Sequence, residues 1–105
     1  MKLADLRINL MTRSADRAGV PLALQPREFR LLAFLMQHAH QIVTRTMLLE
    51  SVWDYRFDPQ TNVIDVHISR LRGKVDKGFE PALIHTVRGV GYSLTDAPER
   101  LPQSA

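Results

Sequence analysis

The alternation of apolar and polar positions predicts an antiparallel sheet at the start of the chain. Apolar and polar side chains alternate over residues 3–10, which is typical of one or two short strands with one solvated face. A turn is predicted over 14–19, and a further short strand over 20–24. Pro21 cannot donate to a sheet ladder, so it confines that strand to an edge or an end.

Two helices are predicted next. Pro26 suits the first position of a helix, and Glu28 in the first turn complements the helix dipole. The apolar stripe that follows predicts a central, buried helix that ends between residues 38 and 41. Thr44 is a good N-cap for a second helix over 45–54, and the Asp58-Pro59 step then predicts a loop.

Residues 61–75 predict a third helix with sharply different sides. At 100° per residue, four apolar side chains fall within about 40° of one line: Ile64, Ile68, Leu71 and Val75. The roughly opposite side is predicted to hold cations, an amide and two exposed valines: Asn62, Val63, Val66, His67, Arg70 and Lys74. Cations match phosphates and guanine, amides match adenine, and methyl groups match thymine in a DNA major groove. An ordinary amphipathic helix with a basic exterior explains this segment equally well.

Residues 83–94 predict a hairpin with a cation at its tip. Gly89 and Gly91 are expected to supply the positive φ angles of a tight turn, which places Arg88 at the tip. A nucleotide-binding interpretation of these glycines is weak, because no helix follows them. The predicted fold class is therefore α+β: a winged helix-turn-helix with an N-terminal antiparallel sheet, three helices and a C-terminal hairpin wing.

Composition bounds the remaining possibilities. The chain has 105 residues, of which 45% are hydrophobic, so we expect one domain over 1–95 and a flexible tail over 96–105. Fourteen Lys and Arg against eleven Asp and Glu give a net charge of +3, which is modest, so the placement of charge matters more than its size. The chain has no run of 18 apolar residues, so no membrane span is predicted. The absence of cysteine excludes disulfides and thiolate chemistry, and is compatible with a cytoplasmic location.

Metal and enzyme sites are not predicted. His38 and His40 lack a third ligand, and the C-terminus of a helix accounts for two histidines at least as well. The acids Glu50, Asp54 and Asp58 are accompanied by neither a nucleophile nor an apolar cleft. We therefore expect no catalytic residue, no metal and no cofactor.

Four segments together resemble the C-terminal effector domain of OmpR/PhoB-type bacterial response regulators. They are Q-P-R-E-F-R-L-L at 25–32, V-T-R-T-M-L-L-E-S-V-W at 43–53, N-V-I-D-V-H-I-S-R-L-R-G-K-V from Asn62, and H-T-V-R-G-V-G-Y from His85. The resemblance covers nearly all of residues 3–94. Three positions depart from it. Gln25 stands where Thr or Ser usually caps the first helix, which is expected to cost about 1 kcal/mol of capping. Asn62 and Ser69 stand where relatives often carry Arg.

The resemblance implies a winged helix that binds double-stranded promoter DNA as a homodimer on direct-repeat half-sites. It also implies a contact with RNA polymerase through the loop over 54–61. The family's receiver domain, on which a cognate sensor kinase acts, is not within these residues. We therefore expect an effector domain separated from its receiver, the alternative being a natural stand-alone regulator. A competing hypothesis is a protein-interaction module whose basic face meets an acidic partner.

These arguments predict four groups of functional residues. The recognition helix contributes Asn62, Val63, Val66, His67, Arg70, Arg72 and Lys74. The wing contributes Thr86, Arg88 and Gly89. The DNA backbone is contacted by Arg45 and by the indole N–H of Trp53, which is equally expected to fill the core. The polymerase-contacting loop contributes Asp54, Tyr55, Phe57 and Asp58, although the two aromatic rings suit a packing role equally well.

Overall fold

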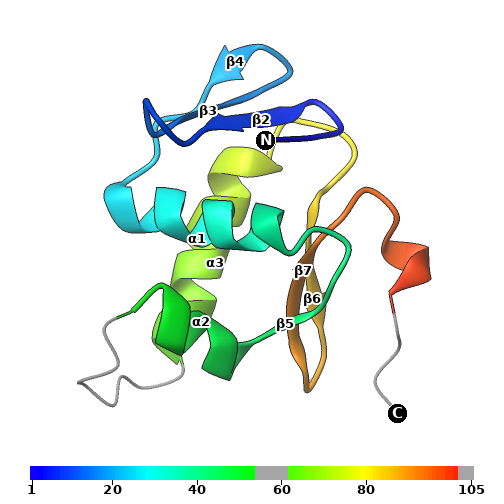
Figure 1. Cartoon of the computed structure of the whole chain (residues 1–105). Helices are drawn as coiled ribbons and strands as arrows, with labels where there is room; N and C mark the ends of the chain where they lie inside the picture. Colours follow the sequence, from blue (N-terminus) through cyan, green and yellow to red (C-terminus); the bar gives the residue numbers. More distant parts are fainter. Residues whose placement is uncertain (54–61, 102–105) are drawn as a thin grey trace.

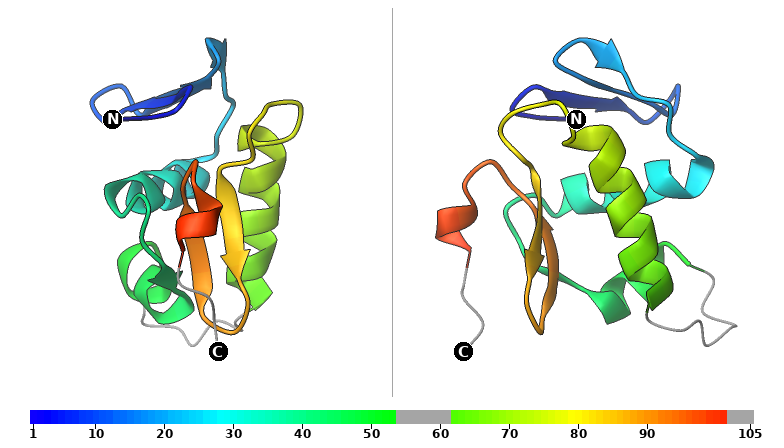
Figure 2. Two further views of the ribbon diagram at one scale, coloured as in Figure 1. Left: turned by 90° about the vertical axis from the view of Figure 1, so that its right-hand side faces the viewer. Right: turned by 180° about the vertical axis from the view of Figure 1, so that it is seen from behind.

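The computed structural model describes residues 1–53 and 62–101, and within these it contains two antiparallel sheets and three α-helices (Figure 1). The elements of the first half are β1 (Lys2–Leu3), β2 (Leu6–Asn9), β3 (Ser14–Arg17), β4 (Val20–Pro21), α1 (Pro26–Gln37), β5 (Val43–Thr44) and α2 (Arg45–Ser51). The second half contributes α3 (Asn62–Val75), β6 (Ile84–Val87), β7 (Gly91–Leu94) and the 3-10 turn η1 (Pro98–Arg100). The N-terminal sheet lies across one end of α3, and the second sheet runs beside α3 (Figure 2). The predicted fold class is confirmed.

The N-terminal sheet has the strand order β1-β2-β3-β4. Leu6 and Ile8 of β2 are buried while Arg7 between them is exposed, as the alternation predicts. The prediction of a turn over 14–19 was wrong, because residues 14–17 form β3 and pair along the whole of β2. The segment Ser-Ala-Asp-Arg carries no apolar alternation, so its strand character comes from pairing with β2. The turn itself lies at Ala18 and Gly19, both with positive φ, and β4 is an edge strand, as Pro21 indicated.

Both helix starts lie where the sequence predicts them. α1 begins at Pro26, and the Glu28 carboxylate accepts a 2.7 Å hydrogen bond from the backbone N–H of Gln25. This bond satisfies one donor at the helix N-terminus, although Gln25 replaces the usual Thr or Ser. Thr44 caps α2, because its hydroxyl accepts a 3.1 Å bond from the N–H of Met47. α2 ends at Ser51, three residues before the predicted end.

The second sheet has the order β5-β7-β6, and its central strand carries a required glycine. β5, which the sequence did not indicate, pairs Val43 with Tyr92 and Thr44 with Gly91. A Cβ atom on Gly91 would lie 2.1 Å from the carbonyl oxygen of Val43, so only glycine fits here. The expected positive φ is found at Gly89 (+75°) and not at Gly91, whose role is close approach to β5.

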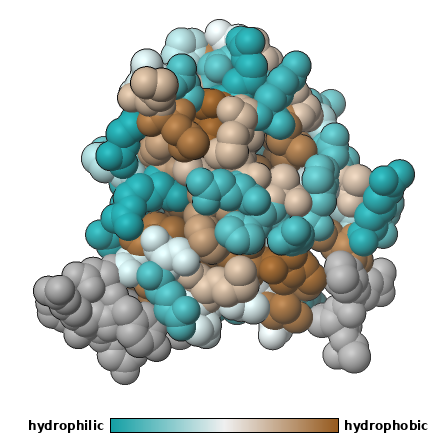
Figure 3. Space-filling model, viewed as in Figure 1, coloured by the Kyte–Doolittle hydropathy of each residue, from teal (hydrophilic) through white to brown (hydrophobic). Residues whose placement is uncertain are grey.

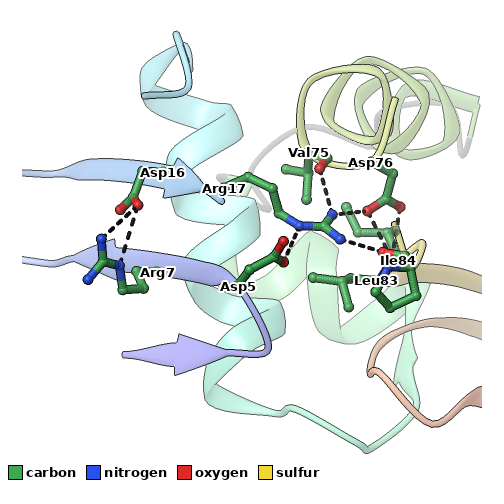
Figure 4. A network of polar contacts seen from close by, with 9 residues as sticks. Asp5, Arg7, Asp16, Arg17, Val75, Asp76, Leu83 and Ile84 are labelled. Atoms are coloured by element: carbon green, nitrogen blue, oxygen red, sulfur yellow. Dashed lines mark hydrogen bonds and ion pairs between the residues drawn. The ribbon is translucent and has the colours of Figure 1, made fainter. Parts of the chain in front are cut away.

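Arg17 joins the N-terminal sheet to the end of α3, and its side chain is fully buried (Figure 4). Its guanidinium donates to the Asp5 carboxylate at 2.5 Å, to the Val75 carbonyl at 2.7 Å and to the Asp76 carboxylate at 3.1 Å. It also donates to the carbonyl of Pro81. The Asp76 carboxylate in turn accepts hydrogen bonds from the backbone N–H groups of Leu83 and Ile84, at the start of β6. One buried cation thus connects β3, α3 and β6.

The surface on the α1 side of the molecule is a mixture of apolar and polar patches (Figure 3). A groove between the N-terminal sheet and α1 has apolar and basic walls, and its lining includes Leu10, Arg13, Phe29, Arg30 and Phe34.

At the other end of the chain, the segment expected to be a tail includes η1, while residues 102–105 lie outside the described residues. Among the helices described, none is long and apolar enough to cross a membrane.

Candidate nucleic-acid interface

α3 buries its apolar seam and exposes a polar stripe on the opposite side. Ile64, Ile68, Leu71 and Val75 are each at most 1% exposed, which confirms the predicted seam. The exposed stripe consists of Val66, Ser69, Arg70 and Gly73. Figure 2 shows that α3 and the β6–β7 hairpin lie next to each other. No acidic residue belongs to this stripe.

Three residues predicted for the outward side of α3 are turned toward the protein. The prediction that Val63 is exposed was wrong, because Val63 is half-buried and packs against the core. His67 is also half-buried, and its Nδ1 lies 2.9 Å from the carbonyl oxygen of Val63. Lys74 reaches back to α1 and forms a 2.6 Å ion pair with Glu28. Helical angles account for this, because Val63, His67 and Lys74 lie within about 60–100° of Ile64, on the flank of the helix. The side opposite the seam, at about 140–240°, belongs to the exposed stripe, so the prediction placed the exposed side too far toward that flank.

The Glu28–Lys74 ion pair fastens α1 to the C-terminal half of α3. Glu28 is only 3% exposed, and burial alone would raise its pKa. Hydrogen bonds from Lys74 and from the Gln25 backbone, together with the charge of Lys74, outweigh burial and lower the pKa of Glu28 below its ordinary value. Glu28 is therefore a carboxylate at neutral pH, and it pairs with the ammonium of Lys74, for which the sequence predicted a contact with DNA.

Trp53 lies between two basic residues. It is 6% exposed, so the expectation of a core residue is confirmed. The His67 ring meets the Trp53 ring edge-on with 5.1 Å between centroids, and the Arg27 guanidinium lies 5.5 Å from the Trp53 ring centroid. A cation within about 6 Å of an aromatic face is attracted by the ring quadrupole. Arg27, which the sequence did not single out, is therefore held beside the helix-turn-helix by Trp53.

The wing is fastened to α3 by a hydrogen bond between Arg72 and Thr86. The Arg72 guanidinium donates at 2.8 Å to the Thr86 hydroxyl, so both residues lie where the two elements meet. The Arg72 Nε is buried and has no hydrogen-bond partner among the described residues. Arg88 and Gly89 are exposed at the tip, and the N–H of Val90 closes the turn by donating to the carbonyl of Val87 at 3.0 Å.

Asp65 lies on the flank of α3 between the exposed stripe and the wing. Its carboxylate accepts a 3.2 Å hydrogen bond from Arg45 Nε, and the hydroxyl of Tyr92 donates to the same oxygen. The Arg45 guanidinium also stacks 5.4 Å from the Tyr92 ring centroid. Burial, the hydrogen bond to Asp65 and the charge of Asp65 raise the pKa of Tyr92, so the phenol keeps its proton. The sequence did not indicate this hydroxyl contact, since no local pattern signals a partner 27 residues away.

Two further predictions concern a loop and a metal. The predicted polymerase-contacting residues Asp54, Tyr55, Phe57 and Asp58 lie outside the described residues, and so does the side chain of Asn62. Over residues 1–53 and 62–101, no three His, Cys, Asp or Glu side chains come together as a metal site would require. His40 instead places Nδ1 2.7 Å from the Thr95 hydroxyl.

Comparisons with known proteins identify the family. The model of the family described as "Transcriptional regulatory protein, C terminal" matches residues 19–94. The OmpR/PhoB homologue DrrB of Thermotoga maritima has 32% identical residues and superposes with a TM-score of 0.80 over 90% of this chain and 43% of its own. This chain belongs to the OmpR/PhoB family. It is an effector-type winged helix, in agreement with the resemblance found in its sequence.

Other members of the OmpR/PhoB family are similar over most of the chain. The transcriptional regulatory protein CusR of Escherichia coli K12 is 47% identical over 93 residues, which are 89% of this chain and 41% of CusR. The DNA-binding domain of RstA from Klebsiella pneumoniae, whose structure is a complex with the RstA box, is 35% identical. It superposes with a TM-score of 0.80 over 90% of this chain and 95% of the RstA chain. The chain thus spans about two-fifths of the length of CusR.

Proposed function

We propose that this winged helix binds double-stranded DNA sequence-specifically, with the exposed stripe of α3 in the major groove and the wing tip at the adjacent backbone or minor groove. The observation that carries the proposal is that Arg70 and Arg88 occur on elements that share one face, in a stripe and a tip that hold no acid (Figure 2). The nearby acids, Asp65 and Asp76, are engaged by Arg45 and Arg17. Family membership supports the same assignment.

Two side chains of the exposed stripe suit base edges, and the other two positions of the stripe are small. The guanidinium of Arg70 can donate two hydrogen bonds to guanine, and the methyl groups of Val66, which is 45% exposed, suit a thymine methyl group. Ser69 and Gly73 keep the middle of the stripe small, so the helix backbone can approach the floor of the groove. Arg72 and Thr86, which join α3 to the wing, lie within reach of the neighbouring phosphates when α3 is in the groove.

The test compares Arg70→Ala with Lys2→Ala, which removes one positive charge from the exposed end of the N-terminal sheet. The probe is a duplex selected by the chain from a randomised library, measured against a scrambled duplex of the same composition. We expect Arg70→Ala to weaken binding to the selected duplex by about 1–3 kcal/mol, and Lys2→Ala to change it far less. Equal losses for both variants would show a general charge effect. A wild-type chain that selects no sequence and shows no salt dependence would favour a protein-interaction module instead.

We extend the proposal to the full-length protein on the basis of family membership. There the chain would be the effector domain of a two-component response regulator, controlled by a receiver domain that a sensor kinase phosphorylates. Two copies would occupy direct-repeat half-sites in promoter DNA, and the loop over 54–61 would contact RNA polymerase. A footprint of the phosphorylated full-length protein should cover two half-sites in the same orientation, and a single or inverted site would contradict this arrangement.

A further inference from the structure

The carboxylate of Asp65 connects the three parts of the proposed interface. Asp65 itself belongs to the first turn of α3, Arg45 is the first residue of α2, and Tyr92 belongs to β7, the return strand of the wing. One oxygen of Asp65 accepts from both Arg45 Nε and the Tyr92 hydroxyl. A displacement of any one of these elements therefore lengthens at least one of these two hydrogen bonds.

The negative charge of Asp65 is unfavourable for DNA binding. The residue lies on the helix proposed to enter the major groove, and its side chain is 46% exposed. A carboxylate near DNA phosphates repels them, and its removal should strengthen binding to any DNA if charge were its only effect. Arg45 offsets this repulsion through the ion pair, and the stacking of its guanidinium on Tyr92 restricts the direction in which the cation points.

We propose that Asp65 is a positioning residue for specific DNA recognition, which acts by fixing Arg45 and the wing relative to the recognition helix. This inference rests on the proposed function. Specific binding requires the exposed stripe of α3, the Arg45 cation and the wing tip to meet base edges and phosphates at the same time. Non-specific binding needs only cations near phosphates, and it tolerates a looser arrangement of the three elements.

A matched pair of variants separates this role from charge and from folding. Asp65→Asn removes the charge and keeps the shape, while Tyr92→Phe removes only the hydroxyl and leaves the buried ring. Glu50→Gln, on the exposed side of α2, removes one carboxylate that neither Arg45 nor Tyr92 contacts. Circular dichroism and thermal melting at the assay temperature establish that each variant is folded before its DNA affinity is measured.

The measurement is the ratio of dissociation constants for a scrambled duplex and for the duplex selected by the wild-type chain. We expect Asp65→Asn to reduce this ratio by about tenfold, because affinity for the selected duplex falls while affinity for the scrambled one is unchanged or slightly higher. Tyr92→Phe should lower the ratio in the same direction, and Glu50→Gln should leave it unchanged. An additional Arg45→Ala change should cost less in the Asp65→Asn background than in the wild type.

Each contrary result identifies a different failure. If Asp65→Asn strengthens binding to both duplexes equally, Asp65 acts only as a charge and the inference is overturned. If both affinities fall equally, its role is structural and the inference is again overturned. If folded Tyr92→Phe keeps the wild-type ratio, the bond between Asp65 and the wing does not position it. If the wild-type chain itself shows no preference between the duplexes, the proposed function fails before this inference is reached.

Discussion

The guanidinium of Arg17, which β3 contributes, donates a 2.7 Å hydrogen bond to the carbonyl oxygen of Val75, the last residue of α3. The last carbonyl groups of a helix have no partner within the helix, so a cation at this point satisfies one of them and also meets the negative end of the helix dipole. Arg17 pairs with Asp76 one residue further on. The N-terminal sheet thus fixes the end of the helix that we propose reads DNA.

Replacement of Arg17 by Met should lower the free energy of unfolding by about 3–5 kcal/mol, because it leaves Asp76 and the Val75 carbonyl without their cation in a buried place. The matched control is Arg7→Gln on β2. Arg7 pairs with Asp16 at 3.2 Å, but its side chain is 62% exposed, so the loss should stay below about 1 kcal/mol. Urea denaturation measures both. Equal losses would show that burial does not distinguish the two pairs.

The sequence predicted those elements whose signals are local. Pro26 and Thr44 mark the starts of α1 and α2 through capping chemistry that involves residues within one turn. The seam of α3 follows from its own periodicity. By contrast, β5 has two residues and exists only because it pairs with β7, and a strand this short carries no period of its own.

The parts of the site that the sequence missed depend on partners far along the chain. Lys74 on the flank of α3 pairs with Glu28, which lies 46 residues earlier in the chain. Three of the acceptors of Arg17 lie 58 to 64 residues later in the chain. Such contacts exist only when the elements are packed, and no local pattern in the sequence signals them.

Two glycines should respond oppositely to alanine. Gly91→Ala should destabilise the fold by at least about 1–3 kcal/mol, because the added Cβ would overlap the Val43 backbone, which cannot move without disturbing β5. At Gly73 a Cβ meets nothing within 4 Å, and the residue lies within a helix, so Gly73→Ala should stabilise by up to about 1 kcal/mol. Thermal unfolding followed by circular dichroism checks both signs. A tolerated Gly91→Ala would contradict the close approach of β5 and β7.

Removal of the cation at the wing tip should weaken DNA binding and its response to salt together. For Arg88→Ala we expect a lower affinity for the selected duplex and a log–log salt slope reduced by up to about one, since one phosphate contact is lost. Val90→Ala alters the same tip without changing its charge, and it should keep the wild-type slope. Titrations at several salt concentrations provide the slopes. If Arg88→Ala is folded and keeps both affinity and slope, the wing takes no part in binding.

The Glu28–Lys74 pair should make stability depend on pH in the acid range. The pKa of Glu28 is lowered on folding, so the stabilisation is fully present above the unfolded-state pKa and is lost as the pH falls through the lower folded-state pKa. Wild type should therefore exceed Glu28→Gln in unfolding free energy at pH 7, and the difference should shrink below about pH 4. Urea titrations between pH 3 and pH 7 measure it.

A second carboxylate variant serves as the control for this experiment. Glu99→Gln removes an exposed carboxylate from η1, away from Lys74, and it accounts for the general effect of one lost negative charge. A difference between wild type and Glu28→Gln that grows toward acid pH would contradict the lowered pKa. Lys74→Met should reproduce most of the Glu28→Gln loss at neutral pH, because it removes the partner of the same ion pair.

Thr44 contacts two different elements, a strand and a helix. It is the last residue of β5, where it pairs with Gly91, and its hydroxyl also caps α2. Thr44 therefore joins the start of α2, the first helix of the helix-turn-helix, to the end of β7 that lies next to the wing tip. The DNA target of this domain can be redesigned by replacing the three residues between Val87 and Gly91, or those of the exposed stripe of α3. The two strand ends on either side must then be kept, since any shift there would carry α2 with it.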